Sequence, residues 1–153
     1  MKVEREIAAD AQRLWSLVSD LERWDELLPT VQQITRIGPE GPIGVGTRFA
    51  VRQPGLPKAV YEVTDWRPRR GFTWVASAGG VRTTASHEVL EAGRSTDGAS
   101  GCRLVLKLTW SGPLAGLVRL LLGAKAQRMV EQEAASFAEL AEGRSEGAAP
   151  ADA

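Results

Sequence analysis

Six strand-like stretches follow one another between residues 31 and 110, and this succession limits the fold more than any other feature of the chain. Each stretch is rich in alternating or β-branched residues, and Gly- or Pro-containing segments separate them. Parallel pairing needs crossovers of about a dozen residues, so these short connections favour an antiparallel sheet. The stretches are Val31–Ile37, Thr47–Arg52, Ala59–Trp66, Phe72–Ser77, Val81–Leu90 and Cys102–Trp110.

Helical signals flank this series on both sides. Val3–Ile7 alternates like a half-buried strand, and Asp10 then suits the N-cap of a short helix. A second short helix is predicted over Leu21–Leu28, before Pro29. Near the C-terminus, Pro113 occupies the preferred first position of a helix that is expected to extend to about Ala141.

The order of these elements predicts an α+β fold. An antiparallel sheet must bury one face, and the C-terminal helix is the only element large enough to cover it. We therefore expect a helix-grip arrangement: a curved seven-stranded antiparallel sheet wrapped around a long C-terminal helix, with two short helices after the first strand. Such curvature leaves a space beside the helix that side chains need not fill.

Length and charge restrict the class of protein further. The 153 residues fit one domain, expected over residues 1–141, with a flexible tail at 142–153. Nineteen basic residues balance nineteen acidic ones, which argues against binding to nucleic acid. The lone cysteine, Cys102, and the lone histidine, His87, cannot build a conventional structural zinc site, and no metal or other cofactor is expected. Without a signal peptide or a membrane span, the default location is the cytoplasm.

Five local patterns follow one another along the chain: Ala11–Asp20 with Trp24 and Pro29, Gly44–Phe49, Val63–Arg70, His87–Val89 and Trp110–Leu114. Together and in this order they resemble the START-like (SRPBCC) superfamily in its polyketide cyclase/dehydrase-like branch. The resemblance covers about residues 2–141, and it implies a helix-grip fold with a ligand cavity. Members of the superfamily include binders, transporters, cyclases, hydrolases and regulators, so the resemblance does not fix the function.

The predicted cavity wall is mainly apolar and aromatic. Trp and Tyr combine an apolar ring with one polar group, which suits a ligand pocket. Trp15 and Trp24, in contrast, are expected to seat the short helices on the domain. The predicted ligand-binding residues are Phe49, Val51, Tyr61, Trp74, His87 and Trp110 on the sheet, closed by Leu117 and Leu121 of the last helix.

His87 is the first candidate for acid–base chemistry, because an unperturbed imidazole titrates near neutral pH. Strand alternation puts His87 on the inner face with Thr83, Ala85 and Val89. There it either acts as an acid or base, orients a ligand carbonyl or hydroxyl, or has a purely structural role. The adjacent Ser86 points to the opposite face, so the two cannot act as a nucleophile–base pair. The chain contains no Gly-x-Ser-x-Gly elbow, dinucleotide fingerprint or phosphate loop.

Three functions remain open at this point. The first is binding or carriage of a small hydrophobic or aromatic molecule, by a monomer or homodimer. An alternative is a cyclase/dehydratase- or hydrolase-type enzyme, in which Tyr61 or a buried carboxylate assists His87. A second alternative is a protein-interaction module, which requires a large exposed apolar patch on the sheet or the helix.

Overall fold

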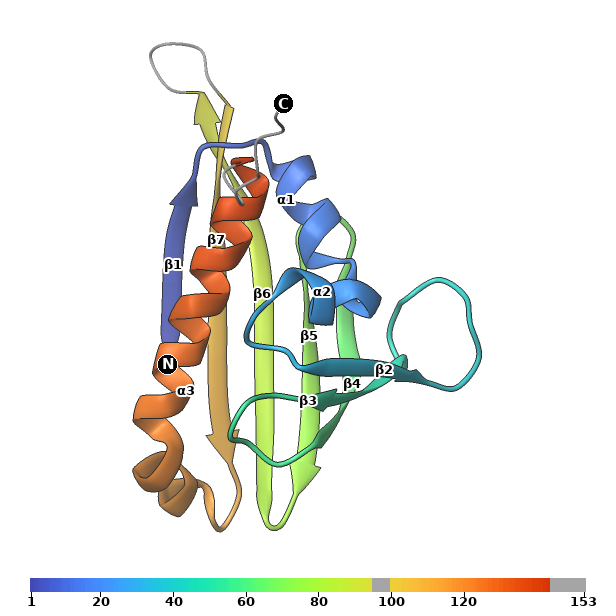
Figure 1. The fold of residues 1–153 in the computed structure, drawn as a ribbon, viewed down its shortest axis with the longest axis vertical. Coiled ribbons are helices and arrows are strands. Elements are labelled where there is room, and N and C mark those ends of the chain that lie inside the picture. Colours follow the sequence, from blue (N-terminus) through green and yellow to red (C-terminus); the bar gives the residue numbers. More distant parts are fainter. Residues whose placement is uncertain (95–99, 144–153) are drawn as a thin grey trace, which may run out of the picture.

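The computed structural model describes residues 1–94 and 100–143, and their elements follow the predicted order (Figure 1). Strand β1 (Lys2–Ile7) precedes helix α1 (Ala11–Val18), a 3₁₀ turn (Leu21–Arg23) and helix α2 (Trp24–Leu27). The remaining elements are β2 (Gln33–Ile37), β3 (Arg48–Arg52), β4 (Ala59–Arg67), β5 (Gly71–Ala78), β6 (Val81–Arg94), β7 (Ser100–Ser111) and α3 (Ala115–Ala141).

All seven strands form one antiparallel sheet in the order β1-β7-β6-β5-β4-β3-β2. A register shift interrupts the β4–β5 pairing between Val63 and Asp65, and such bulges bend a strand. In Figure 1, β2 and β3 cross in front of the long strands β5 and β6, while α3 runs beside β1 and β7. The α+β helix-grip prediction is therefore confirmed.

Element boundaries differ from the predicted ones by a few residues. Strand β2 begins at Gln33 rather than Val31, because the Val31 amide donates to the Leu28 carbonyl in a turn after α2. Helix α3 begins at Ala115 rather than Pro113, because the Ala115 amide closes a turn onto Gly112. Strand β6 continues past Leu90 to its end at Arg94.

The predicted tail falls largely outside the described residues, which end at Gly143. Glu142, which we assigned to that tail, accepts a hydrogen bond from the Ala8 amide through Oε2 at 2.8 Å. The domain therefore makes at least one contact beyond residue 141. The tip of the β6–β7 hairpin, residues 95–99, also lies outside the described part of the chain.

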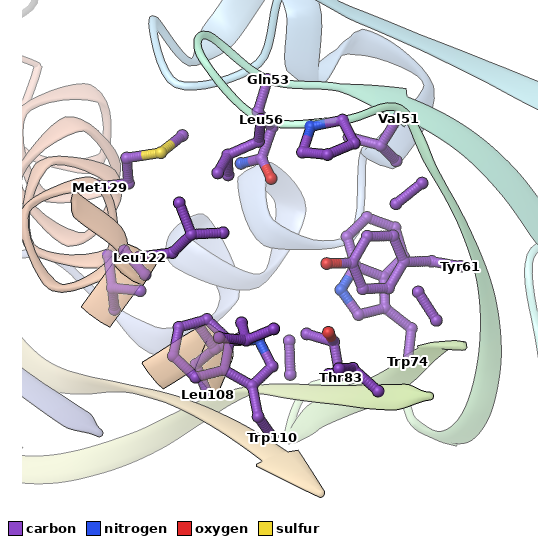
Figure 2. Close-up of a pocket in the computed structure, with 18 of the residues that line it drawn as sticks. Val51, Gln53, Leu56, Tyr61, Trp74, Thr83, Leu108, Trp110, Leu122 and Met129 are labelled. Carbon is purple, nitrogen blue, oxygen red and sulfur yellow. The ribbon is translucent and has the colours of Figure 1, made fainter. Parts of the chain in front are cut away.

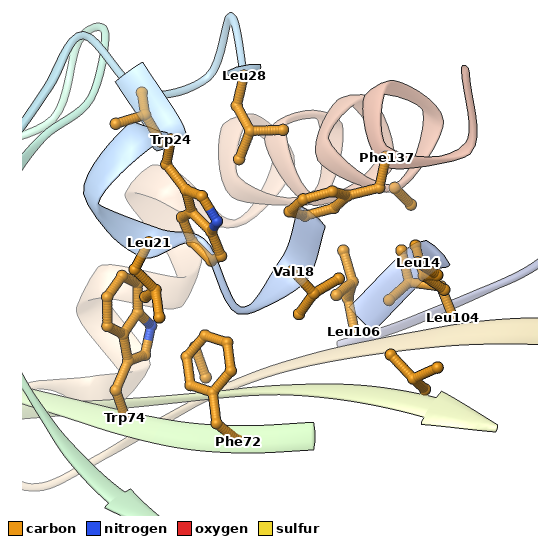
Figure 3. Close-up of a cluster of buried hydrophobic side chains, with 14 of the residues drawn as sticks. Leu14, Val18, Leu21, Trp24, Leu28, Phe72, Trp74, Leu104, Leu106 and Phe137 are labelled. Carbon is orange, nitrogen blue, oxygen red and sulfur yellow. The ribbon is translucent and has the colours of Figure 1, made fainter. Parts of the chain in front are cut away.

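One end of the space between sheet and helix is filled by a continuous apolar core (Figure 3). Helix α3 contributes Phe137, which is fully buried, and small residues that let its backbone approach the neighbouring elements. Helix α1 contributes Leu14 and Val18, and the Asp10 carboxylate caps it by accepting from the Arg13 amide at 2.8 Å. This core fixes the position of α3 along the sheet.

Two further properties follow from the described residues, 1–94 and 100–143. None of their helices is long and apolar enough to cross a bilayer, and no three of their ligating side chains cluster as a metal site would require.

Burial, with smaller effects from Asp10 and Glu142, raises the pKa of the Cys102 thiol to about 11. At neutral pH that thiol is protonated and therefore a poor nucleophile.

Candidate ligand-binding cavity

The other end of the space between sheet and helix is a cavity of about 370 Å³. That volume lies within the range of roughly 300–1,000 Å³ that is usual for small-molecule sites. Figure 2 shows side chains of α3 on one side of an open centre and aromatic residues of the sheet on the other. The labelled wall consists of Leu122 and Met129 from α3, Tyr61, Trp74, Thr83, Leu108 and Trp110 from the sheet, and Val51, Gln53 and Leu56 from β3 and the loop after it.

The cavity has an exposed end and a buried end. At the exposed end, Leu117 and Leu121 of α3 belong to the wall, yet they are 50% and 68% exposed. At the buried end, Trp24 and His87 are almost inaccessible. A ligand would therefore enter between the first turns of α3 and the neighbouring loops.

The loop between β3 and β4 forms part of the cavity wall and approaches α3. Its Gly55 adopts a φ of +72°, and a side chain there would collide with the ammonium group of Lys125. Leu56, one residue later, belongs to the cavity wall. This loop therefore approaches α3 closely at Lys125 and contributes an apolar side chain to the cavity wall.

Tyr61 and Trp74 form the aromatic part of the sheet wall. Their rings stack with centroids 4.6 Å apart, and Trp24 meets the edge of Trp74 at 5.3 Å. Burial, and to a lesser degree the charge of Glu133, raises the pKa of Tyr61 to about 12. Its phenol therefore remains protonated at neutral pH and offers an O–H group to the cavity.

A polar pair, His87 and Glu133, closes the buried end. His87 Nε2 lies 3.0 Å from Glu133 Oε1, and the two side chains are 5% and 13% exposed. A carboxylate can only accept, so this bond assigns the proton to Nε2. The imidazole also stacks on Phe72 at 4.5 Å, and within the described residues its Nδ1 has no hydrogen-bond partner. Packing and the carboxylate together fix the ring orientation.

Glu133 is a polar wall residue that the sequence alone did not single out, although a buried carboxylate was one of the two partners considered for His87. The spacing of residues along α3 could have identified it. Glu133 lies four residues after Met129 and four before Phe137, on the stripe of α3 that faces inward. A carboxylate on an apolar helical stripe needs a polar partner, and the sequence offers His87.

The structure places seven of the eight predicted ligand-binding residues at the cavity: Val51, Tyr61, Trp74, His87, Trp110, Leu117 and Leu121. Phe49 is not part of the wall. Its side chain is fully buried and packs against Trp74 at 6.2 Å, so that Trp74 forms the wall at this point.

The two tryptophans of the short helices differ in position. Trp15 contacts Trp66 at a centroid distance of 5.3 Å, which seats α1 on β4. Trp24 packs against Phe72 and Phe137 and also reaches the cavity wall. Trp24 therefore both holds α2 on the core and lines the cavity.

Solved structures similar to this chain share its fold. With the hypothetical protein jhp0584 from Helicobacter pylori, the TM-score is 0.73 at 13% identity, over 92% of this chain and 86% of that one. For XoxI from Bacillus cereus, the TM-score is 0.66 at 12% identity, over 92% and 94% of the two chains. The third is the di-domain aromatase/cyclase StfQ of steffimycin biosynthesis, with a TM-score of 0.65 at 13% identity, over 93% of this chain and 45% of that one.

Sequence comparisons give the family. No curated protein sequence matches this chain significantly. A family model described as polyketide cyclase / dehydrase and lipid transport matches residues 1–142, which is nearly the whole length. The chain therefore belongs to the polyketide cyclase / dehydrase and lipid transport family, within the START-like (SRPBCC) superfamily.

Proposed function

We propose that this domain binds and carries a small hydrophobic or aromatic molecule in its internal cavity. The observation that carries the proposal is the cavity itself: about 370 Å³, walled mainly by apolar side chains, with a few polar groups that include those of Tyr61, His87 and Glu133. An apolar pocket with a few fixed polar groups is the usual form of a small-molecule site. The family description supports the same class of ligand.

Filling the cavity tests this proposal. Ala126 is buried and lines the cavity, so Ala126→Phe would place a ring in the ligand space. Ala124 is exposed on the same helix and is not part of the wall, so Ala124→Phe is a matched control. We expect ligands found by native mass spectrometry and thermal-shift screening to bind Ala126→Phe at least about tenfold more weakly. Unchanged binding by Ala126→Phe would contradict the proposal.

A cyclase/dehydratase-type enzyme is the second candidate, and the His87–Glu133 pair favours it. A hydrogen-bonded imidazole and carboxylate beside a ligand space can take up and return a proton. Incubation with a poly-β-ketone and mass spectrometry would detect dehydrative cyclisation as the loss of one water per ring formed. Turnover that persists in His87→Phe would exclude this role for His87.

An interaction module is the third candidate, and the exposed leucines of α3 favour it. Leu120 is 80% exposed and is not part of the cavity wall, and Leu117 and Leu121 lie on neighbouring turns. Light scattering of the wild type and Leu120→Lys tests self-association through this surface. If both proteins are monomers at every concentration, α3 does not form a homodimer interface.

A further inference from the structure

The buried end of the cavity has an unbalanced charge. Glu133 is the acidic residue in the wall, and the basic residues there are Lys58 and Lys107. Both lysines are exposed, and the Lys107 ammonium lies 3.7 Å from Glu88 at the surface. Among the described residues, His87 alone lies within ion-pair distance of Glu133, and no lysine or arginine does. The carboxylate therefore faces the cavity without a strong counter-ion.

One oxygen of Glu133 is free to meet a ligand. Oε1 lies 3.0 Å from Nε2 of His87, whereas no side chain or amide of the described residues donates to Oε2. The glutamate side chain is 13% exposed and belongs to the cavity wall, so its accessible surface faces the ligand space. A donor on a ligand could therefore pair with Oε2, and hydrogen bonds to charged groups are stronger than those between neutral groups.

A hydroxyl group fits this arrangement and a carboxylate does not. The hydroxyl can donate to Oε2 of Glu133, and the Tyr61 phenol lines the same cavity and can donate to the hydroxyl oxygen. A ligand carboxylate would instead bring a second negative charge beside Glu133, in a partly buried space where the repulsion is screened less than in bulk water. The Nε2 proton of His87 is already used by Glu133.

We propose that Glu133 determines the ligand specificity of the cavity, which selects aromatic molecules bearing a hydroxyl group and rejects carboxylates of the same size. This inference rests on the proposed function, since it requires that the cavity binds a ligand. It separates this chain from carriers of fatty acids, whose heads are anionic. It also gives Glu133 a role distinct from orienting His87.

Four probes with one ring system and different head groups test the inference. They are 2-naphthol, 2-methoxynaphthalene, 2-methylnaphthalene and 2-naphthoate, titrated calorimetrically at neutral pH. We expect 2-naphthol to bind at least about tenfold more tightly than 2-methoxynaphthalene, which lacks the donor, because hydrogen bonds to charged groups contribute that much. We expect 2-naphthoate to bind more weakly still.

Glu133→Gln tests the residue directly. The amide oxygen of the variant can accept from His87, which turns the amide NH₂ toward the cavity as a donor. We therefore expect the affinity for 2-naphthoate to rise by at least about tenfold relative to the affinity for 2-naphthol, while the affinity for 2-methylnaphthalene stays the same. Glu139→Gln makes the same charge change at an exposed position of α3 and should leave all four affinities unchanged.

The outcomes separate this inference from the proposed function. If all four probes bind the wild type with equal affinity, the inference is wrong and the binding function stands. An unchanged ratio of 2-naphthol to 2-naphthoate in Glu133→Gln would also overturn it. If none of the four probes binds the wild type, the proposed function fails and the inference fails with it. Because the head-group series uses the wild-type protein, a poorly folded variant would not prevent the test.

Discussion

The two halves of α3 use hydrophobic residues in opposite ways. In the second half, residues 129–141, the buried positions are mostly alanines, and Ala134 and Ala138 are each 1% exposed. In the first half, residues 115–128, large apolar side chains lie at the surface, and Leu120 and Leu121 are 80% and 68% exposed. The small residues occur where the helix approaches other elements closely, and the leucines occur at the entrance of the cavity.

Helix α3 therefore has one segment that packs in the core and another that lines the cavity. A helix that is apolar on most of its circumference normally lies in a core, and the first half of α3 has that composition without the burial. The exposed leucines of this half therefore contribute little to the free energy of unfolding. They instead provide apolar surface beside the ligand space.

Truncating one large side chain in each half of α3 should give the largest difference in the free energy of unfolding. Phe137 is fully buried, and Phe137→Ala should lower the free energy of unfolding by about 3–5 kcal/mol, because it leaves a cavity in the core. Leu121→Ala should change it by no more than about 0.5 kcal/mol, because most of that side chain already contacts water. Urea denaturation of the two variants measures both values. Similar losses would mean that the two halves are equally packed.

Titration of Tyr61 tests whether the space beside the first half excludes water. The pKa of this phenol is raised to about 12, chiefly by burial and also by Glu133. Between pH 10 and 12 the folded state then holds a proton that the unfolded state has lost, so the free energy of unfolding should fall as the pH rises through this range. Tyr61 is the only tyrosine, so phenolate absorbance reports on it alone. A midpoint near 10, the ordinary value, would show a hydrated cavity.

Much of the sheet side of the cavity could be predicted from the sequence. Short turns specified antiparallel neighbours, and the two-residue period of a strand then placed Tyr61 with Val63, and His87 with Ala85, on one face. Trp74 and Trp110 followed from the same period on their own strands. Periodicity works here because a wrong phase would expose the whole apolar set of a strand to water.

The contacts between elements could not be predicted in the same way. The His87–Glu133 bond joins residues 46 positions apart, and it depends on how far α3 is shifted along the sheet. Trp24 belongs to a four-residue helix whose direction is set by packing rather than by its own sequence. Phe49 also lies on the inner face of the sheet, but Trp74 and other neighbours bury it away from the cavity. The residue pattern of a single strand does not show which inward side chains are buried in this way.

The cap of α1 supports the packed half of α3, and removing it should change the free energy of unfolding less than Phe137→Ala does. Asp10 accepts from the Arg13 amide, while the Arg13 side chain donates to the carbonyls of Leu140 and Ala141 at 3.1 and 3.3 Å. Asp10→Ala should lower the free energy of unfolding by about 1 kcal/mol. Asp10→Asn retains a capping oxygen and should cost only a few tenths of a kcal/mol. Equal losses in chemical denaturation would assign the effect to charge rather than to the cap.

A substitution in the open half should stabilise the protein slightly. Gly123 lies inside α3, and a Cβ there would meet only the Cγ of Arg119, at 3.8 Å, which is ordinary van der Waals contact. Gly123→Ala should therefore raise the free energy of unfolding by about 0.5–1 kcal/mol, the intrinsic helix preference of alanine, with no packing penalty to offset it. Because Gly123 is not part of the cavity wall, ligand affinity should not change. A loss of stability in thermal or urea unfolding would instead place this turn against another surface, and the first half of α3 would no longer be the open one.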